Sequence, residues 1–169
     1  AIQQYKAFLK AHPEHPKGDL ARRGLALSHY ASKQYKEASV PLSTLLAKEV
    51  LDPTISRERL VMMQGQCLLI TNQKEQSKAL YVAEISSLKT PAYLNAALAS
   101  ISDVSFSAGA WDQVVEWTTK LLAANPDKAR AARGHYQQGY AHYQLKAPEQ
   151  AIESLSKIQS LDADPVWTT

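Results

Sequence analysis

The stretch GHYQQGYAHYQLKAPEQAIESL, residues 134–155, decides the fold because its landmarks recur along the whole chain. Within it, Ala151 and Leu155 stand four positions apart, so they share one face of a helix. Counterparts of Ala151 recur every 37 to 39 residues, at Ala1, Ala38, Ser77 and Val114, and we call these five positions the register residues. Their partners four positions later are Tyr5, Leu42, Tyr81 and Thr118. A period between about 20 and 50 residues is typical of stacked repeats rather than of a globule with one unique core.

Prolines punctuate the repeats. One follows every register residue after 12 to 15 positions, at Pro13, Pro53, Pro91, Pro126 and Pro165. Between them, apolar residues recur at helical spacing and nowhere alternate as in a strand, so we predict an all-α chain. Asp19, Ser56 and Thr90 are predicted to cap helices. The predicted helices are 1–9, 19–32, 35–50, 57–70, 75–87, 91–106, 111–124, 128–145 and 148–161.

This pattern resembles the tetratricopeptide repeat (TPR) family. Its repeats pair a first helix carrying Leu-Gly with a second helix carrying an alanine and a large residue four positions on. The last repeat is the most similar, with Gly139, Ala151 and Leu155 at the matching places. Earlier matches are Leu25-Ala26, Gly65 with Tyr81, and Gly109 with Trp111. The resemblance implies a right-handed α-solenoid of antiparallel helix pairs, in which small residues let the two helices of a pair cross closely.

The period of about 37 residues exceeds the 34 usual for that family, and the additional residues fall mainly in the turns between repeats. We predict a single TPR-like repeat domain over residues 1–169 and expect it to be a segment of a longer protein. The repeats are placed at about 1–15, 19–53, 56–91, 92–127 and 128–165.

The proline-bearing turns are similar to those in repeats of bacterial envelope proteins. So are the segments FLKAHP at 8–13 and QYKEA at 34–38. This similarity favours a periplasmic or envelope-associated protein, with the cytoplasm as the alternative, so the compartment stays open.

Charge and composition exclude several classes of function. The 19 lysines and arginines against 16 acidic residues leave a formal net charge of +3, and no basic run exceeds Arg22-Arg23. We therefore expect no nucleic-acid partner. No apolar stretch approaches the roughly 18 residues of a membrane-spanning helix, so we expect no direct membrane insertion. Cys67 is the single cysteine, which excludes an internal disulfide and a multi-cysteine zinc site.

The sequence predicts no catalytic residue, no metal site and no cofactor. His135 and His142 share a helix face, but no Asp, Glu or Cys stands three or four positions from either. The sequence contains neither a nucleophile-elbow motif nor a phosphate-binding glycine loop. We therefore expect the segment not to be an enzyme.

The resemblance also implies that the first helices line a concave surface and that residues one turn apart on them contact a ligand. Arg, Tyr and Met are enriched at protein interfaces, although aromatic residues at helical spacing also serve packing between helices. The carboxylate clamp of some family members needs Lys and Asn at set places, and Arg23 with Leu27 does not reproduce it. The predicted partner-binding residues are Arg23, Leu27, Tyr30, Arg59, Met62, Gln66, Ser100, Asp103, Arg133, Tyr136, Gln137 and Tyr140.

These features favour a non-catalytic protein–protein interaction scaffold that binds a peptide or a partner protein in its concave groove. Arg23, Arg59 and Arg133 favour an acidic partner, because guanidinium groups pair with carboxylates. Two alternatives stay open. One is a structural spacer or self-assembly segment of a longer solenoid, which would associate through its repeat ends. The other is a regulatory repeat domain fused to an enzyme that lies outside this segment.

Overall fold

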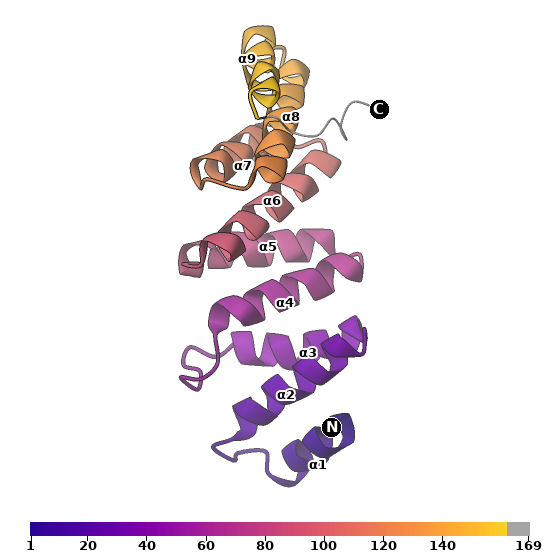
Figure 1. Cartoon of the computed structure of the whole chain (residues 1–169). Helices are drawn as coiled ribbons and strands as arrows, with labels where there is room; N and C mark the ends of the chain where they lie inside the picture. The colour runs from indigo at the N-terminus through magenta and orange to yellow at the C-terminus, as the bar shows by residue number, and fades with distance from the viewer. Residues whose placement is uncertain (162–169) are drawn as a thin grey trace. The chain divides into compact units, whose positions relative to one another are not determined.

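The computed structural model describes residues 1–161, and the regular elements in this range are all helical (Figure 1). The predicted repeat landmark Pro165 lies outside the described residues. The helices are α1 (Ile2–Ala11), α2 (Gly18–Ala31), α3 (Tyr35–Leu46), α4 (Arg57–Ile70), α5 (Lys74–Glu84), the 3₁₀ turn η1 (Ile85–Ser87), α6 (Pro91–Ser107), α7 (Trp111–Ala123), α8 (Lys128–Gln144) and α9 (Pro148–Gln159). The prediction of an all-α chain is confirmed.

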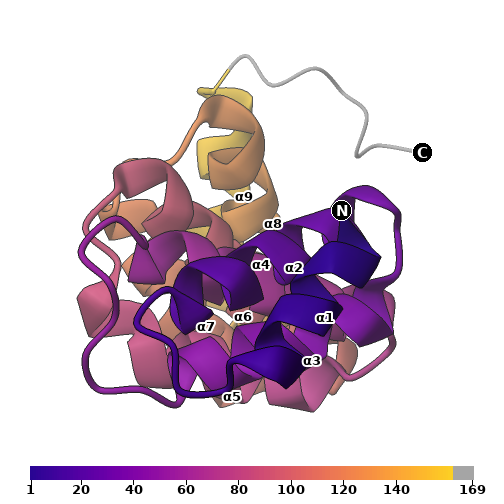
Figure 2. The ribbon, with the colours of Figure 1, turned by 90° about the horizontal axis from the view of Figure 1, so that it is seen from below.

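The helices pack with their neighbours in sequence, in two compact units. In the unit Ala1–Ser87, α1 packs on α2, α2 on α3, α3 on α4, and α4 on α5 (Figure 2). In the unit Leu88–Thr169, α6 packs on α7, α7 on α8, and α8 on α9, while α8 also contacts α6. The helices thus form the consecutive pairs α2–α3, α4–α5, α6–α7 and α8–α9. Pro91, which the predicted boundary 56–91 placed in the second repeat, is the first residue of α6.

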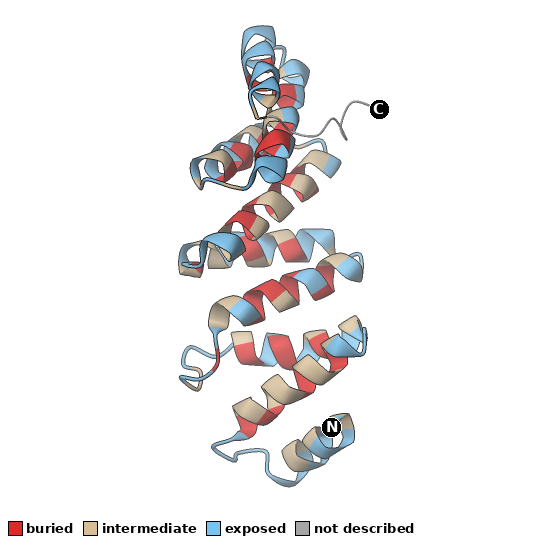
Figure 3. Ribbon diagram, viewed as in Figure 1, coloured by how far each residue is buried: buried red, intermediate tan, exposed pale blue. Residues whose placement is uncertain are grey.

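Each α-helix from α2 to α9 carries buried residues (Figure 3). Four of the five register residues are buried, as the period predicts, whereas Ala1 is exposed. Ala38, Ser77 and Val114 have no exposed surface, and Ala151 keeps 5%. At Gly65 the ring of Tyr81 lies so close that an added Cβ would stand 2.1 Å from its Cζ atom. The first helix of a pair therefore meets the large residue of the second helix at the position of the glycine.

Each turn within a repeat ends its first helix in the same way. The residue five positions before the register residue has a left-handed backbone, and the next N–H reaches back to the last turn of the helix, as Ala147 N–H does to the His142 carbonyl at 2.9 Å. The left-handed residues are Lys33 (φ 57°), Asn72 (φ 62°), Gly109 (φ 69°) and Lys146 (φ 58°). The turn geometry repeats although only one of these residues is a glycine.

Some predicted helix ends differ from the structure. The helix predicted to start after Asp19 begins at Gly18, and Asp19 does not cap it. Its carboxylate instead accepts from Arg22 at 3.0 Å and from Lys48 at 2.7 Å. Ser56 does cap α4, because its hydroxyl accepts from the Arg59 N–H at 3.3 Å. Thr90 stands at the N-cap of α6 without a capping side-chain hydrogen bond.

The segment after α3 is longer than predicted. The helix ends at Leu46 and not at Val50, and Arg57 donates to the carbonyl oxygens of Leu46 and Lys48, both at 3.1 Å. Arg57 also pairs with Glu84 of α5 at 2.6 Å. One arginine therefore fixes the end of α3 and holds it near the end of α5.

Candidate functional site

The unit Ala1–Ser87 has a groove between its two first helices, α2 and α4. The groove encloses about 110 Å³, and its floor is mainly apolar. The turn before α4 closes one end of it through Thr54 and Ile55. Its lining residues are Arg23, Ala26, Leu27, Leu42, Thr54, Ile55, Ser56, Arg59, Leu60 and Met63. Three predicted partner-binding residues, Arg23, Leu27 and Arg59, thus meet in one groove.

Arg23 and Arg59 border this groove differently. The Arg23 guanidinium donates to the Thr54 carbonyl at 3.0 Å, so it is tied to the turn. That turn is ordered by Asp52, whose carboxylate accepts from the Thr54 hydroxyl at 2.6 Å and from its N–H at 2.9 Å. These hydrogen bonds lower the pKa of Asp52, and the charge of Arg23 adds to the effect. Arg59 is exposed. The groove thus offers a fixed cation and an exposed one above an apolar floor.

Three other predicted residues of this unit contribute to packing rather than to the groove. The Tyr30 hydroxyl donates to the Gln66 side-chain oxygen, which joins α2 to α4, and burial raises the pKa of Tyr30. Met62 is buried, with its carbonyl facing the Tyr81 hydroxyl at 3.5 Å. The residue that lines the groove is its neighbour Met63, because one step along a helix turns the side chain by about 100°.

The unit Leu88–Thr169 has a second groove, between the first helices α6 and α8, of about 220 Å³. Its walls carry more polar groups than those of the first groove. Ser100 donates to the Ala96 carbonyl of its own helix at 2.9 Å, and Arg130 pairs with Asp127. The lining residues are Ala96, Ala99, Ser100, Asp103, Leu121, Arg130, Arg133, Gly134 and Gln137. Four predicted residues, Ser100, Asp103, Arg133 and Gln137, meet here.

A hydrogen-bond network joins α6 to α8 at this groove. Ser102 donates to the Gln137 side-chain oxygen at 2.8 Å, and the Gln137 amide donates to Asp103 at 2.7 Å. Arg133 pairs with the same Asp103 oxygen at 2.9 Å. Burial raises the pKa of Asp103, and the contacts with Gln137 and Arg133 oppose that rise. Gln137 is 4% exposed, so it anchors α8 and offers no free group to a ligand.

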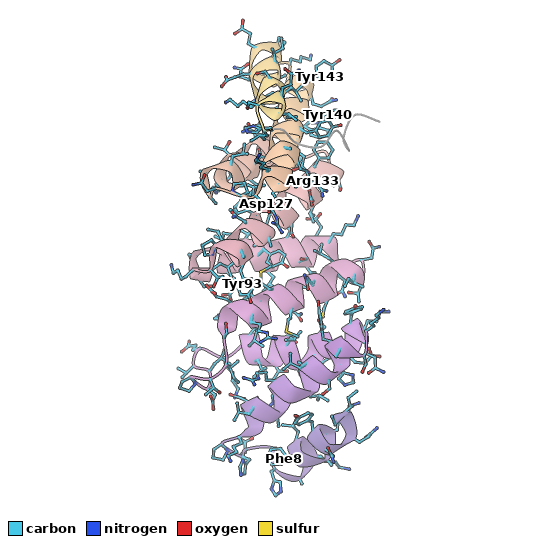
Figure 4. All side chains as sticks on the ribbon, viewed as in Figure 1. Phe8, Tyr93, Asp127, Arg133, Tyr140 and Tyr143 are labelled. Carbon is cyan, nitrogen blue, oxygen red and sulfur yellow. The ribbon has the colours of Figure 1, made fainter. Side chains whose placement is uncertain are left out.

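Aromatic rings cluster at the far end of the same helices. Phe106 lies 5.3 Å from Tyr140 and 6.3 Å from Tyr136, and Trp111 lies 5.5 Å from Tyr140, measured between ring centroids. Tyr136 and Tyr140 are nevertheless 41% and 37% exposed. Arg133, Tyr140 and Tyr143 follow one another along α8 (Figure 4). The two predicted tyrosines, Tyr136 and Tyr140, therefore pack against neighbouring rings with part of their surface and expose the rest to solvent.

A metal-binding cluster and a membrane-spanning helix are both absent from residues 1–161. Within residues 1–161 no group of three His, Cys, Asp or Glu side chains could hold a metal ion. In the same range no helix is both long and apolar enough to cross a membrane. Burial raises the pKa of the Cys67 thiol to about 11, which disfavours the reactive thiolate. The ring centroids of His12 and His15 lie 6.0 Å apart, and both side chains are exposed in the turn before α2.

Several groove residues were not predicted from the sequence. Thr54 and Ile55 belong to the turn between repeats, whose sequence does not recur. Leu60 was not predicted, whereas Met63 falls on the helical projection of α4 beside Met62 but is not among the predicted partner-binding residues. Trp111 was read as a turn aromatic, and its contact with Tyr140 depends on how the next repeat packs.

Comparison with known proteins reveals the fold. No family model matches the sequence, and neither does any curated protein. The crystal structure of MamA matches with a TM-score of 0.68 at 20% identity, over 95% of this chain and 86% of that one. YrrB, described as a TPR protein with an unusual peptide-binding site, matches with a TM-score of 0.69 at 17% identity, over 99% of this chain and 78% of that one.

A kinesin light chain protein of Podosopora anserina with nearly identical TPR-like repeats also matches. Its TM-score is 0.61 at 15% identity, and the match covers 96% of this chain and 85% of that one. Identities this low concern the fold and not the partner. The fold class predicted from the sequence is confirmed, and this chain has the tetratricopeptide-repeat fold.

Proposed function

We propose that this chain is a non-catalytic protein-interaction scaffold that binds a peptide or a partner protein between its first helices. We also propose that residues 1–169 form a single repeat domain. The groove between α2 and α4 is the observation that supports this function best. It combines an apolar floor, to which Leu27 and Met63 contribute, with the guanidinium groups of Arg23 and Arg59. Apolar pockets with a few convergent polar groups are typical of ligand sites.

The chemistry of this groove favours a segment with an apolar side chain beside a carboxylate. The apolar side chain would enter between α2 and α4, and the carboxylate would lie at Arg59, which is exposed. The groove between α6 and α8 supports this preference less, because Arg133 already pairs with Asp103. The peptide-binding description of YrrB, which shares the fold, agrees with the proposal.

A defined peptide panel tests the proposal. Fluorescence anisotropy would measure the binding of labelled peptides that carry one Leu or Phe beside an Asp, an Asn or a Lys. We expect the Asp peptides to bind most tightly and the Lys peptides least. The Arg23→Glu/Arg59→Glu variant should weaken binding of the Asp peptides by about tenfold or more, since reversing two charges adds repulsion to the lost pairing. Single exposed charges usually contribute below about 1 kcal/mol, so the pair is changed together.

Two controls separate charge from folding. The variant Lys36→Glu/Lys78→Glu makes the same net charge change on the second helices. Neither lysine lines a groove, so peptide binding should persist. Leu27→Arg should block the apolar floor of the groove for every peptide. Circular dichroism of each variant checks that the helices remain. Equal binding of Asp and Lys peptides, or unchanged binding by the Arg23→Glu/Arg59→Glu variant, would contradict the proposed site.

A further inference from the structure

One wall of the groove between α2 and α4 comes from outside the helices. It is the end of the segment 47–56, which joins α3 to α4 and contributes Thr54 and Ile55. Ile55 is buried in the core cluster of this unit, and the Thr54 carbonyl accepts from the Arg23 guanidinium at 3.0 Å. The shape of the groove therefore depends on where the backbone of this segment lies.

The second half of the segment is a turn held by its own hydrogen bonds. The Asp52 carboxylate accepts from the hydroxyl and the N–H of Thr54, and the Asp52 carbonyl accepts from the Ile55 N–H at 2.8 Å. The three residues 49–51 separate this turn from Lys48. Because so short a stretch has a limited reach, the position of the Lys48 backbone restricts where the turn can lie.

The start of the segment is tied to both first helices. The Lys48 ammonium pairs with Asp19 of α2 at 2.7 Å. Arg57, the first residue of α4, donates to the carbonyls of Leu46 and Lys48, both at 3.1 Å. The last carbonyls of a helix have no partner within the helix, and here a side chain supplies one. Arg57 thus fixes the direction in which the segment leaves α3.

Glu84 of α5 orients this arginine. Its two carboxylate oxygens accept from Arg57 Nε at 3.0 Å and from Nη2 at 2.6 Å, the two-point pairing that suits a planar guanidinium. The Ser87 hydroxyl donates to Glu84 Oε2 at 3.1 Å and steadies the carboxylate. The hydrogen bonds from Arg57 lower the pKa of Glu84 against the effect of burial. The Glu84 side chain is only 16% exposed, so the pair is largely shielded from solvent.

We propose that Arg57 and Glu84 are positioning residues for ligand binding in the groove between α2 and α4. Neither side chain lines the groove. Glu84 orients Arg57, Arg57 holds the start of the segment 47–56, and the segment places Thr54 and Ile55 at the groove. This role rests on the proposed function, since it concerns the affinity of the same groove. An ion pair between α4 and α5 therefore sets how tightly a ligand binds between α2 and α4.

The affinity of a charge-neutral double variant tests this role. Arg57→Ala/Glu84→Ala removes the ion pair and leaves the net charge unchanged. The probe is the labelled peptide with Leu beside Asp, followed by fluorescence anisotropy at a temperature at which circular dichroism shows the variant fully folded. A lower stability alone then leaves the dissociation constant unchanged. We expect that constant to rise by about tenfold, because the four hydrogen bonds of Arg57 are lost.

The matched control is Glu116→Ala/Lys120→Ala. This pair also lies on a second helix, α7, and its distance is also 2.6 Å, but neither residue lines a groove. Its loss should leave the dissociation constant unchanged. The milder variant Arg57→Lys keeps the charge but loses the planar fork, so it should raise the constant by about threefold. In both Arg57 variants the preference for Asp over Asn peptides should persist, because Arg59 is untouched.

The outcomes separate this role from the proposed function. If Arg57→Ala/Glu84→Ala and Arg57→Lys bind as tightly as the wild type while Arg23→Glu/Arg59→Glu does not, the positioning role is overturned and the groove remains the binding site. An equal loss in the Glu116→Ala/Lys120→Ala control also overturns the role, since removal of any ion pair would then have the same effect. A wild type that binds no peptide of the panel overturns both the function and the role.

Discussion

Replacing Gly65 with alanine tests whether the close packing of the repeats is described correctly. The new Cβ would stand 2.1 Å from Cζ and 2.2 Å from the hydroxyl oxygen of Tyr81. That is roughly 1.4 Å short of the 3.5 Å at which carbon atoms normally touch. Tyr81 is 1% exposed, so its ring cannot move out into solvent without losing its buried contacts.

Two opposing effects determine the size of the change. Overpacking of a filled core costs about 1–3 kcal/mol, while alanine gains up to about 1 kcal/mol over glycine in a helix interior. We therefore expect Gly65→Ala to lower the free energy of unfolding by about 1–2 kcal/mol. Gly134→Ala on α8 is the matched control. There the nearest atom, Leu122 Cδ2, lies 3.4 Å from the added Cβ, so this variant should gain about 0.5–1 kcal/mol.

The assay is urea denaturation followed by circular dichroism, fitted with separate transitions where the repeats do not unfold together. The double variant Gly65→Ala/Tyr81→Leu adds a further test, because it reproduces the pair Ala26 and Leu42, both fully buried in the repeat before. Its loss should be smaller than the sum of the two single losses by about 0.5 kcal/mol or more. Stabilisation by Gly65→Ala, of the size expected for Gly134→Ala, would show that the Tyr81 ring does not lie on Gly65.

Two further predictions concern the turn after α8 and one histidine on that helix. At equivalent turn positions Lys146 has a φ of 58° and Gly109 a φ of 69°, a left-handed backbone that favours glycine. Lys146→Gly should therefore raise the free energy of unfolding by about 0.5–1 kcal/mol, and Gly109→Ala should lower it by about 1 kcal/mol. Thermal unfolding measures both changes. Burial, with a smaller contribution from Lys157, lowers the pKa of His135 below its usual 6.5. The unfolded chain therefore binds this proton more readily than the folded chain, so the free energy of unfolding should fall as the pH drops below about 7. In the His135→Leu variant this fall should be shallower between about pH 7.5 and 5.5.

The sequence predicted the parts of the fold that repeat. Ala38, Ser77 and Val114 are fully buried because each occupies the same place in a helix pair, and a period alone locates that place. The helix that Asp19 was predicted to cap begins before it, at Gly18, and the helix predicted over 35–50 ends four residues early. Helix ends depend on single contacts, such as those of Arg57 with the carbonyls of Leu46 and Lys48 at the end of α3, and a sequence pattern does not predict such contacts.

The candidate grooves were predicted only in part. Helical projection places Arg23 and Arg59 on the groove side of their helices, because each residue of a helix is rotated by a constant angle from the one before it. The projected face of α4 contained both Met62 and Met63, and the predicted list kept Met62, although the side chain that lines the groove is that of Met63. Helical projection could not foresee that Gln137 is used up by Ser102 and Asp103, because hydrogen bonds between helices depend on both partners at once.

The small residue of each first helix and its partner on the second helix both vary along the chain. Sixteen positions separate them, and the pairs are Ala26 with Leu42, Gly65 with Tyr81, Ser102 with Thr118, and Gly139 with Leu155. The bulkiest partner, Tyr81, stands opposite a glycine, whereas a serine accompanies the much smaller Thr118. Close packing needs a glycine on the first helix where a large ring lies on the second, whereas a serine is accommodated opposite a small residue. The repeats therefore diverge in sequence while keeping one geometry. In the last pair Leu155 is 40% exposed, because no further helix of the described chain covers it.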